Sequence, residues 1–203
     1  MIPTLLVGDY LFVSKYTYGY SRHSLPFSIP IIPGRVFYSE PNLGDVAVFK
    51  TPVDNRTDFI KRIVGLPGDK VQLKSGVLFI NDKAVKRRRL PDSAIRDAVG
   101  NLKTVARYEV ILPNGVRHQI QESEGDSGWL DNTPKFSVPP DHFFTLGDNR
   151  DNSSDSRVFG FVPMKNLVGK AEFLFFSIKN SSAWKIWNWY SSVRVERLLK
   201  KLK

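Results

Sequence analysis

Proline and glycine divide this chain into short apolar runs, and residues that favour turns follow most of them. The 203 residues contain 13 prolines and 14 glycines. A proline inside a helix removes a backbone hydrogen bond, and a glycine there lowers helix stability. Short strands joined by turns accommodate both residues better. We therefore predict an all-β fold built mostly from antiparallel sheets.

The predicted strands occur throughout the chain. They comprise residues 10–15, 45–50, 59–64, 71–73, 77–80, 108–112, 116–120, 142–146 and 171–177. Pro113, Asn114 and Gly115 separate two of these runs and are typical of a β-hairpin. Residues 87–104 are mostly polar and carry no strand prediction. We expect residues 81–140 to form a smaller β subdomain inserted into a core of residues 1–80 and 141–178.

The C-terminal residues 179–203 differ in pattern, because apolar residues fall near one face of a helix. These are Trp184, Trp187, Val195, Leu198 and Leu202. Basic residues accompany them: Lys185, Arg194, Arg197, Lys200, Lys201 and Lys203. We predict a basic amphipathic helical tail suited to a membrane interface, with an ordinary helix packed on the domain as the alternative. The apolar loop at residues 29–33 also has two interpretations: it inserts into lipid, or it packs over the hydrophobic core.

The charge balance restricts the partners of the chain. Thirty basic and twenty acidic residues give a formal net charge of +10, which favours either nucleic acid or an anionic membrane surface. The absence of cysteine excludes disulfides and thiol chemistry. No apolar run approaches the roughly 18 residues that a membrane-spanning helix needs.

Residues 59–70 contain a lysine in an apolar strand pattern. Alternation places Phe59, Lys61 and Ile63 on one face and sends Arg62 to the other. A lysine between two large apolar neighbours either protects a sheet edge or is a desolvated amine. Burial would lower the pKa of such an amine and let it act as a base.

Residues 147–157 form a dense acid–base cluster around Asp148, Asp151 and Asp155, with Arg150 and Arg157. Their spacing fails the calcium-loop pattern, and two arginines argue against a cation, so we expect a salt-bridge network. The three histidines do not have metal-ligand spacing either. They are His23, His118 and His142. We therefore predict neither a metal site nor a cofactor.

Three segments, in this order, resemble bacterial type I signal peptidase, a membrane-bound serine–lysine peptidase that removes signal peptides. They are residues 1–10, the Lys61 segment, and residues 147–157 followed by residues 160–163. The similarity extends from Met1 to about Ser177. One such motif would be weak, but three in order are specific. The resemblance implies a signal-peptidase-like β core from residues 1–80 and 141–178.

The resemblance also implies roles for individual residues. Lys61 would be the general base, and Ser153 the hydroxyl that supports it. Residues near the nucleophile or lining the substrate cleft would be Met1, Pro3, Leu5, Phe59 and Ile60. Residues that keep the site rigid would be Arg62, Gly147, Asp148, Asp155 and Arg157. Each apolar residue of the first set alone is equally compatible with a place in the core.

One departure from the family pattern affects the expected activity. In the family the nucleophilic serine immediately precedes the methionine that matches Met1. We expect this chain to lack that serine, the oxyanion hole beside it and the preceding membrane segment, and therefore to be inactive as given. The alternatives are a non-catalytic relative that binds exported chains and a basic nucleic-acid-binding β protein.

The resemblance implies partners and a location as well. We expect signal peptides of exported preproteins and an anionic membrane surface as partners, and no nucleic acid. The protein would be a monomer at the bacterial inner membrane, with its catalytic region on the periplasmic side.

Overall fold

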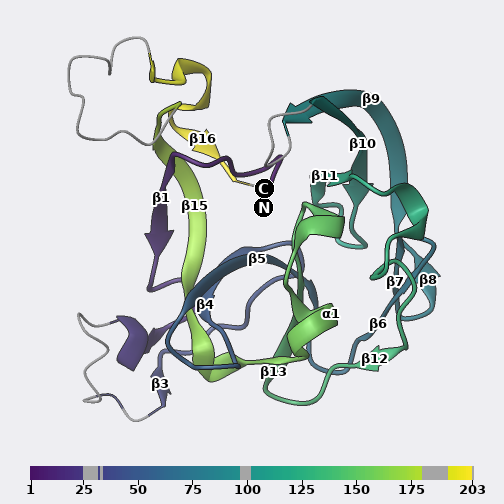
Figure 1. The fold of residues 1–203 in the computed structure, drawn as a ribbon. Helices are drawn as coiled ribbons and strands as arrows, with labels where there is room; N and C mark the ends of the chain where they lie inside the picture. The colour runs from purple at the N-terminus through teal and green to yellow at the C-terminus, as the bar shows by residue number, and fades with distance from the viewer. Residues whose placement is uncertain (25–31, 33, 97–101, 180–191, 203) are drawn as a thin grey trace.

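Strands make up most of the structure (Figure 1), a computed structural model that describes residues 1–24, 32, 34–96, 102–179 and 192–202. The strands are β1 (Asp9–Ser14), β2 (Tyr20–Ser21), β3 (Arg35–Val36), β4 (Val46–Lys50), β5 (Asp58–Gly65), β6 (Lys70–Lys74), β7 (Val77–Ile80), β8 (Lys83–Ala84), β9 (Lys86–Arg96), β10 (Leu102–Ile111), β11 (Arg117–Glu122), β12 (Phe136–Ser137), β13 (His142–Leu146), β14 (Val162–Pro163), β15 (Leu167–Ser177) and β16 (Lys200–Lys201). The helical segments are α1 (Ser156–Phe159) and the 3₁₀ turns η1 (Arg22–Ser24), η3 (Gly125–Ser127), η4 (Arg150–Asn152), η5 (Met164–Asn166) and η7 (Val195–Arg197). The predicted all-β class is confirmed.

The largest sheet of the described residues carries the Lys61 strand in its interior. Its order is β1-β15-β4-β5-β13-β14, and β16 also pairs with β15. All of these pairs are antiparallel. Strand β5 lies between β4 and β13, and the Lys61 side chain is half-buried, which favours a desolvated amine over protection of a sheet edge.

Two smaller sheets, β11-β10-β9 and β12-β6-β7-β8, form the other side of the molecule (Figure 1). Strands β9 and β10 include residues 87–96 and 102–104, which have no strand prediction. All side chains of Lys86–Ile95 are exposed or half-buried, so β9 lacks the apolar alternation that reveals a strand. Strands β6 and β7, within the predicted core range, pair with β8 and β12, within the predicted insertion range. The boundaries at residues 80 and 140 stay a prediction.

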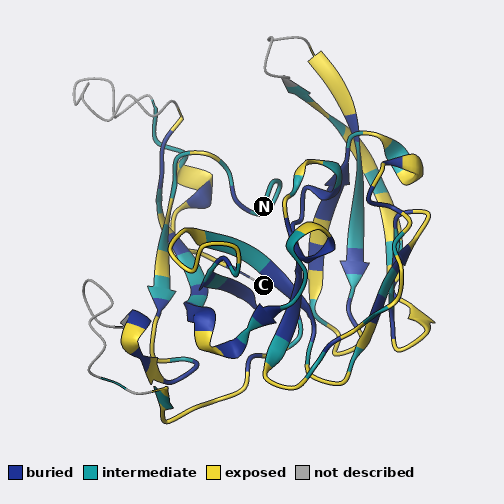
Figure 2. Ribbon diagram, turned by 60° about the horizontal axis from the view of Figure 1, so that its bottom comes forward, coloured by how far each residue is buried: buried dark blue, intermediate teal, exposed yellow. Residues whose placement is uncertain are grey.

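The core consists of three apolar clusters, and β5 contributes to two of them. Ile63 packs with Phe49 and Phe143, whereas Val64 packs with Leu73 and residues of the smaller sheets. Successive residues of β5 therefore face opposite sides of the main sheet, as alternation predicts. Most of the buried apolar residues lie on the strands, whereas β9 is exposed or half-buried along its described side chains (Figure 2).

The described part of the tail differs from the predicted helix, which is wrong for residues 193–202. These residues include the single turn η7 and the strand β16. Strand β4 covers only the first part of β15, and β16 pairs with Phe173 and Leu174 further along. Pairing this open edge satisfies backbone groups that a helix would leave exposed. Trp184, Lys185 and Trp187, like most of the loop at residues 29–33, lie outside the described residues.

Within the described residues, no helix has the length and apolar character to cross a membrane.

Candidate active site

Strand β5 brings Lys61 to Ser153 across 92 residues of sequence. Lys61 Nζ donates a hydrogen bond to Ser153 Oγ at 3.0 Å. The same amine lies 5.6 Å from the centre of the Phe59 ring, two residues away on the same face of the strand. The sequence-predicted base and its predicted supporting hydroxyl are therefore in direct contact.

Gly147 leaves the space in which this contact forms. It follows β13, and a Cβ atom at this position would lie 2.0 Å from Ser153 Oγ and 3.6 Å from Lys61 Nζ. The φ angle of Gly147 is not in the left-handed region, so glycine is not needed here for its backbone conformation. It is needed for the space that a Cβ atom would occupy. Any side chain at residue 147 would displace the Ser153 hydroxyl from the lysine.

The surroundings of Lys61 favour its neutral form. Burial lowers the pKa of this amine below its ordinary value. The charge of Asp155 raises the pKa, Arg157 lowers it, and Asp148 raises it. Desolvation is the largest of these effects, so Lys61 loses its proton more readily than a lysine in water.

Two buried ion pairs flank the lysine. Arg62 donates from Nε and Nη2 to the two oxygens of Asp148, each at 3.0 Å, and from Nη1 to the carbonyl of Gly44 at 2.8 Å. Burial alone would raise the pKa of Asp148, but the Arg62 guanidinium outweighs it and holds the pKa at about 2. This bidentate pair joins β5 to the residue that follows Gly147.

The second pair holds the two ends of the Ser153 loop together. Arg157 donates from Nε and Nη2 to the oxygens of Asp155, each at 2.9 Å. Asp155 also accepts from the Gly147 amide at 2.9 Å and caps helix α1. A second bond from Arg157 Nη2 reaches the Arg150 carbonyl at 2.6 Å. The segment between Gly147 and Arg157 is thus closed on itself around Ser153.

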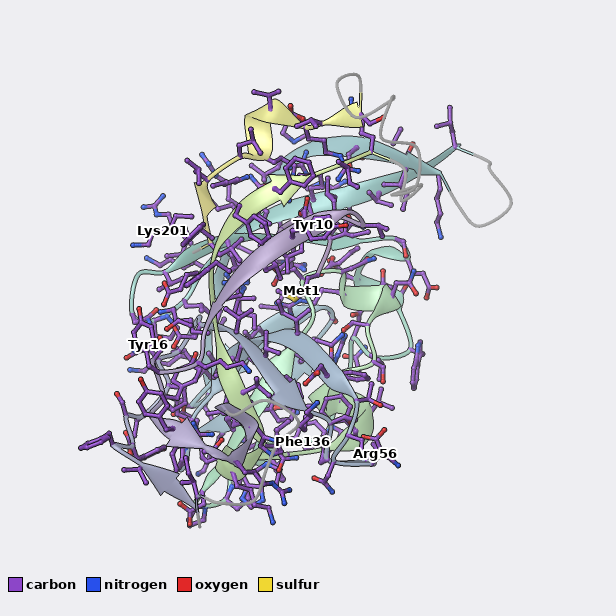
Figure 3. All side chains as sticks on the ribbon, turned by 90° about the vertical axis from the view of Figure 1, so that its left-hand side faces the viewer. Met1, Tyr10, Tyr16, Arg56, Phe136 and Lys201 are labelled. Atoms are coloured by element: carbon purple, nitrogen blue, oxygen red, sulfur yellow. The ribbon has the colours of Figure 1, made fainter. Side chains whose placement is uncertain are left out.

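The amino group of Met1 lies in the same charged environment. Burial lowers the pKa of this group, and the nearby charges that act on it are Asp148, Lys61 and Asp155. Thr4 Oγ1 donates to Asp148 Oδ2 and fixes the N-terminal segment beside the Arg62 pair. Met1 lies in the middle of the molecule behind strand β1 in the view of Figure 3. The structure therefore brings the first residue of the sequence to the lysine.

The predicted cleft residues divide into separate groups. Leu5 is buried in the cluster of Val46, Ala171, Leu174 and Leu202, with Met1 and Ile60 packed partly against it. Phe59 packs instead against the cluster of Phe49 on the other side. Pro3 lines a cavity beside β11. Burial gives Leu5 a place in the core, and a cleft role for this set stays a prediction.

Several residues that support the loop were missed by the sequence analysis. The Gln121 amide donates to the Asp148 carbonyl at 2.9 Å. The amides of Ser123 and Glu124 both donate to Asp151, at 2.6 and 2.7 Å. Strand β11 of the predicted insertion therefore docks directly on the Ser153 loop. The turn-forming Asp151 was visible in the sequence, but its partners 27 and 28 residues earlier were not.

No group of three or more His, Cys, Asp or Glu side chains in the described part of the chain is arranged to hold a metal ion. The chemistry that these residues support is proton transfer. A desolvated lysine can accept a proton from a hydroxyl, and the neighbouring ion pairs keep it in place.

A β scaffold that presents a desolvated lysine to a serine hydroxyl is typical of serine peptidases that use lysine as the base. A model of the family described as "Signal peptidase, peptidase S26" matches residues 1–176, and the chain belongs to this family. The resemblance predicted from the three segments is confirmed.

Named relatives agree with the family model. Signal peptidase I of Rickettsia typhi is 42% identical over 221 residues, which cover 100% of this chain and 82% of that protein. Signal peptidase I of Rickettsia conorii is 40% identical over 221 residues, which cover 100% and 81%. A crystal structure of a signal peptidase I from Enterococcus faecalis V583 is 24% identical, with a TM-score of 0.39. It covers 65% of this chain and 97% of that chain.

The Arg62–Asp148 pair predicts a large stability loss on Asp148→Asn. Arg62 would remain buried without a carboxylate, which costs about 3–5 kcal/mol. Urea unfolding at pH 7, followed by circular dichroism, measures this loss. Since the pKa of Asp148 is lowered from 3.8 to about 2, the pair's contribution is present above pH 3.8 and is lost as pH falls toward 2.

Asp58→Asn is the matched control, because Asp58 pairs with Lys50 at the surface at 2.9 Å. That variant should lose no more than about 1 kcal/mol. Equal losses in the two variants would contradict the central place given to the buried pair.

Proposed function

We propose that this chain is the catalytic region of a type I signal peptidase, which removes signal peptides from exported preproteins with a serine–lysine dyad. The observation that carries the proposal is the 3.0 Å bond between Lys61 and Ser153 in a site where burial lowers the lysine pKa. The family assignment supports the same reaction.

The nucleophile in this proposal is a serine joined to the amino group of Met1. A residue attached there would lie beside Lys61, since the Met1 amine is near enough for the lysine charge to act on it. Ser153 is the supporting hydroxyl that orients the amine and is not the nucleophile. Backbone and side-chain groups at that same serine would stabilise the oxyanion.

Lys61 acts as the proton acceptor in both steps of the proposed reaction, acylation of the serine and hydrolysis of the acyl-enzyme. Neutral Lys61 takes the proton of the serine hydroxyl while the serine oxygen attacks the carbonyl carbon of the scissile peptide bond. The protonated lysine then gives this proton to the departing amine, and an acyl-enzyme ester remains. Lys61 next accepts a proton from water, whose oxygen attacks the carbonyl carbon of the ester, and returns this proton to the serine oxygen as the ester bond breaks. The products are a carboxylic acid, the free serine and the exported chain with a new amino terminus.

The substrate enters beside apolar side chains in this proposal. Met1, Ile60 and Phe59 are half-buried rather than fully enclosed, and shallow apolar sites of this kind accept small residues and exclude larger ones. Signal peptides end in small residues in an A-x-A-like pattern. The proposed specificity is therefore cleavage after small side chains.

Lys61 variants test the base. In a version of the chain extended by a serine before Met1, Lys61→Ala and Lys61→Arg should each lower peptide cleavage by at least about 100-fold, since neither supplies a neutral amine. Parent activity should rise with pH through a pKa below the ordinary lysine value of 10.5. Lys70→Ala removes an exposed lysine elsewhere and should leave cleavage unchanged.

A stability measurement separates loss of chemistry from loss of fold. The lowered pKa means that the folded chain holds the Lys61 proton less tightly than the unfolded chain does, so charging this lysine destabilises the fold as pH falls below 10.5. Lys61→Met should therefore be at least as stable as the parent at pH 7. Substantial cleavage by Lys61→Ala or Lys61→Arg would remove Lys61 as the base.

Three versions of the chain test the nucleophile on a peptide with an A-x-A site. The version with serine before Met1 should cleave after the small residue, and the version with alanine there should not. The 203-residue chain should also be inactive, because Lys61 then has no hydroxyl of a nucleophile to deprotonate. Similar rates for all three would contradict this mechanism, and no cleavage by any of them would favour the non-catalytic alternative.

An anionic membrane surface is the second proposed partner, and exposed aromatic residues of β1 and β15 support it. Tyr10 contacts the rings of Phe175 and Phe176, and Phe12 stacks on Phe173 with ring centres 5.1 Å apart. Tyr10, Phe12 and Phe175 are exposed. We call these five residues the aromatic strip. It lies on the side of the molecule that faces the viewer in Figure 3, where Tyr10 is labelled.

The proposed location follows from this partner. The protein would act at the bacterial inner membrane, with its catalytic region on the periplasmic side, as a monomer. Aromatic and basic residues together suit the interface between headgroups and acyl chains. A nucleic-acid partner has no need of the half-buried contact between Lys61 and Ser153.

Vesicle binding tests the aromatic strip. The double variant Phe12→Ser, Phe175→Ser should bind vesicles that contain phosphatidylglycerol at least about fivefold more weakly, because less apolar surface enters the interface. Added salt should weaken binding of the parent. Trp129→Ser, an exposed residue outside the strip, is the control. Tighter binding to duplex DNA than to vesicles at physiological salt would favour the nucleic-acid alternative.

A further inference from the structure

A cavity lies apart from the lysine–serine contact, where the N-terminal segment meets β11 and the C-terminal strand β16. Its volume is about 230 Å³. Both chain ends lie between the β1–β15 side and the β9–β11 side of the molecule (Figure 1). The lining residues are Pro3, Thr4, Arg117, His118, Gln119, Lys200, Lys201 and Leu202.

Three basic residues from two distant parts of the sequence line this cavity. Arg117 comes from β11, and Lys200 and Lys201 form β16. None of the eight lining residues is acidic. The carboxylate nearest to Arg117 is that of Glu109 at 3.9 Å, and Glu109 also bonds Arg88 at 3.1 Å. Positive charges held close together repel one another, and an anion between them reduces that cost.

The cavity wall also holds a neutral polar side chain without a protein partner. His118 is buried, and neither ring nitrogen has a hydrogen-bond partner among the described residues. Burial lowers the pKa of His118 to about 3, so the imidazole is neutral and carries one N–H donor. Gln119 accepts from Arg107 through its carbonyl oxygen at 2.5 Å, which leaves its amide hydrogens as donors. The lining is therefore rich in donors and positive charge.

The adjoining cavity provides a comparison within the same molecule. It shares Arg117 and Leu202 with the first and also contains Lys170 and Asp45. There the two charges form an ion pair at 2.7 Å. The cations of the first cavity have no such acid among its lining residues, which distinguishes it as the place for an external anion.

We propose that the cavity between residues 3–4, β11 and β16 binds a phosphate group. The Arg117 guanidinium can present two parallel donors to phosphate oxygens, and the two lysines add point charges. Thr4 lines this cavity and also donates to Asp148, which pairs with Arg62. A bound phosphate would therefore contact both terminal segments and β11. Thr4, at the cavity, connects this site to the Arg62–Asp148 pair through one hydrogen bond.

Titration of the 203-residue chain with inorganic phosphate tests this site without any peptide cleavage. Calorimetry measures the affinity, and phosphate should also raise the melting temperature, since a ligand that binds only the folded state stabilises it. The double variant Lys200→Gln, Lys201→Gln and the single variant Arg117→Gln should each bind phosphate at least about fivefold more weakly. All three residues are exposed, so the variants should fold.

The control is Lys83→Gln, Lys103→Gln, which removes two exposed lysines away from the cavity. It should bind phosphate as the parent does. Equal weakening in the control and in the cavity variants would overturn the proposal, because binding would then follow net charge alone. Absence of phosphate binding by the parent at millimolar concentration would overturn it as well.

A second ligand identifies the source of the phosphate. Glycerophosphoglycerol is the soluble diester headgroup of phosphatidylglycerol. If it binds more tightly than inorganic phosphate and the cavity variants lose that preference, the site takes a lipid headgroup. If inorganic phosphate binds more tightly, the site takes a soluble phosphate. Vesicle binding without binding of either soluble ligand would overturn the cavity as a phosphate site and leave only surface attraction.

Discussion

The bidentate pair of Arg62 and Asp148 is the interaction on which the rest of the site depends. Both side chains are almost completely buried, and a buried charge is tolerated only when its partners are complete. Arg62 therefore also binds the Gly44 carbonyl, and Asp148 also accepts from Thr4. These bonds fix β5, the end of β13 and the N-terminal segment relative to one another. Lys61 takes its position from the same strand, one residue before Arg62 and on the opposite face.

The two ion pairs also settle an electrostatic conflict at Lys61. Carboxylates close to an amine favour its charged form, yet a lysine base must be neutral. Asp148 and Asp155 lie near enough to raise the pKa of Lys61, but each is bonded on both oxygens by its own arginine. Arg157 acts on the lysine in the opposite direction to these acids. Burial then remains the largest effect, and it lowers the pKa.

Local patterns in the sequence predicted the parts of this arrangement that depend on neighbouring residues. Alternation along β5 separated Lys61 from Arg62, and the Asn114-Gly115 turn marked the β10–β11 hairpin. The family resemblance brought Lys61 and Ser153 together. The bonds to Asp151 from the residues that follow β11 were not predicted, and neither was the β9 strand. The bonds to Asp151 come from backbone amides, which carry no sequence signal. Strand β9 belongs to a hairpin whose exposed side chains lack apolar alternation.

The C-terminal segment shows why a charge count alone misleads about partners. Arg197 is buried and bonds both oxygens of Asp9 and the Thr4 carbonyl, and Arg194 reaches the Val7 carbonyl at 3.0 Å. These two arginines hold the N-terminal segment in place and are not available to an external anion. Lys200 and Lys201 lie only a few residues further on, yet they are exposed at a cavity without acidic lining. The same basic run therefore serves two purposes, and only side-chain contacts separate structural charge from charge that can bind a partner.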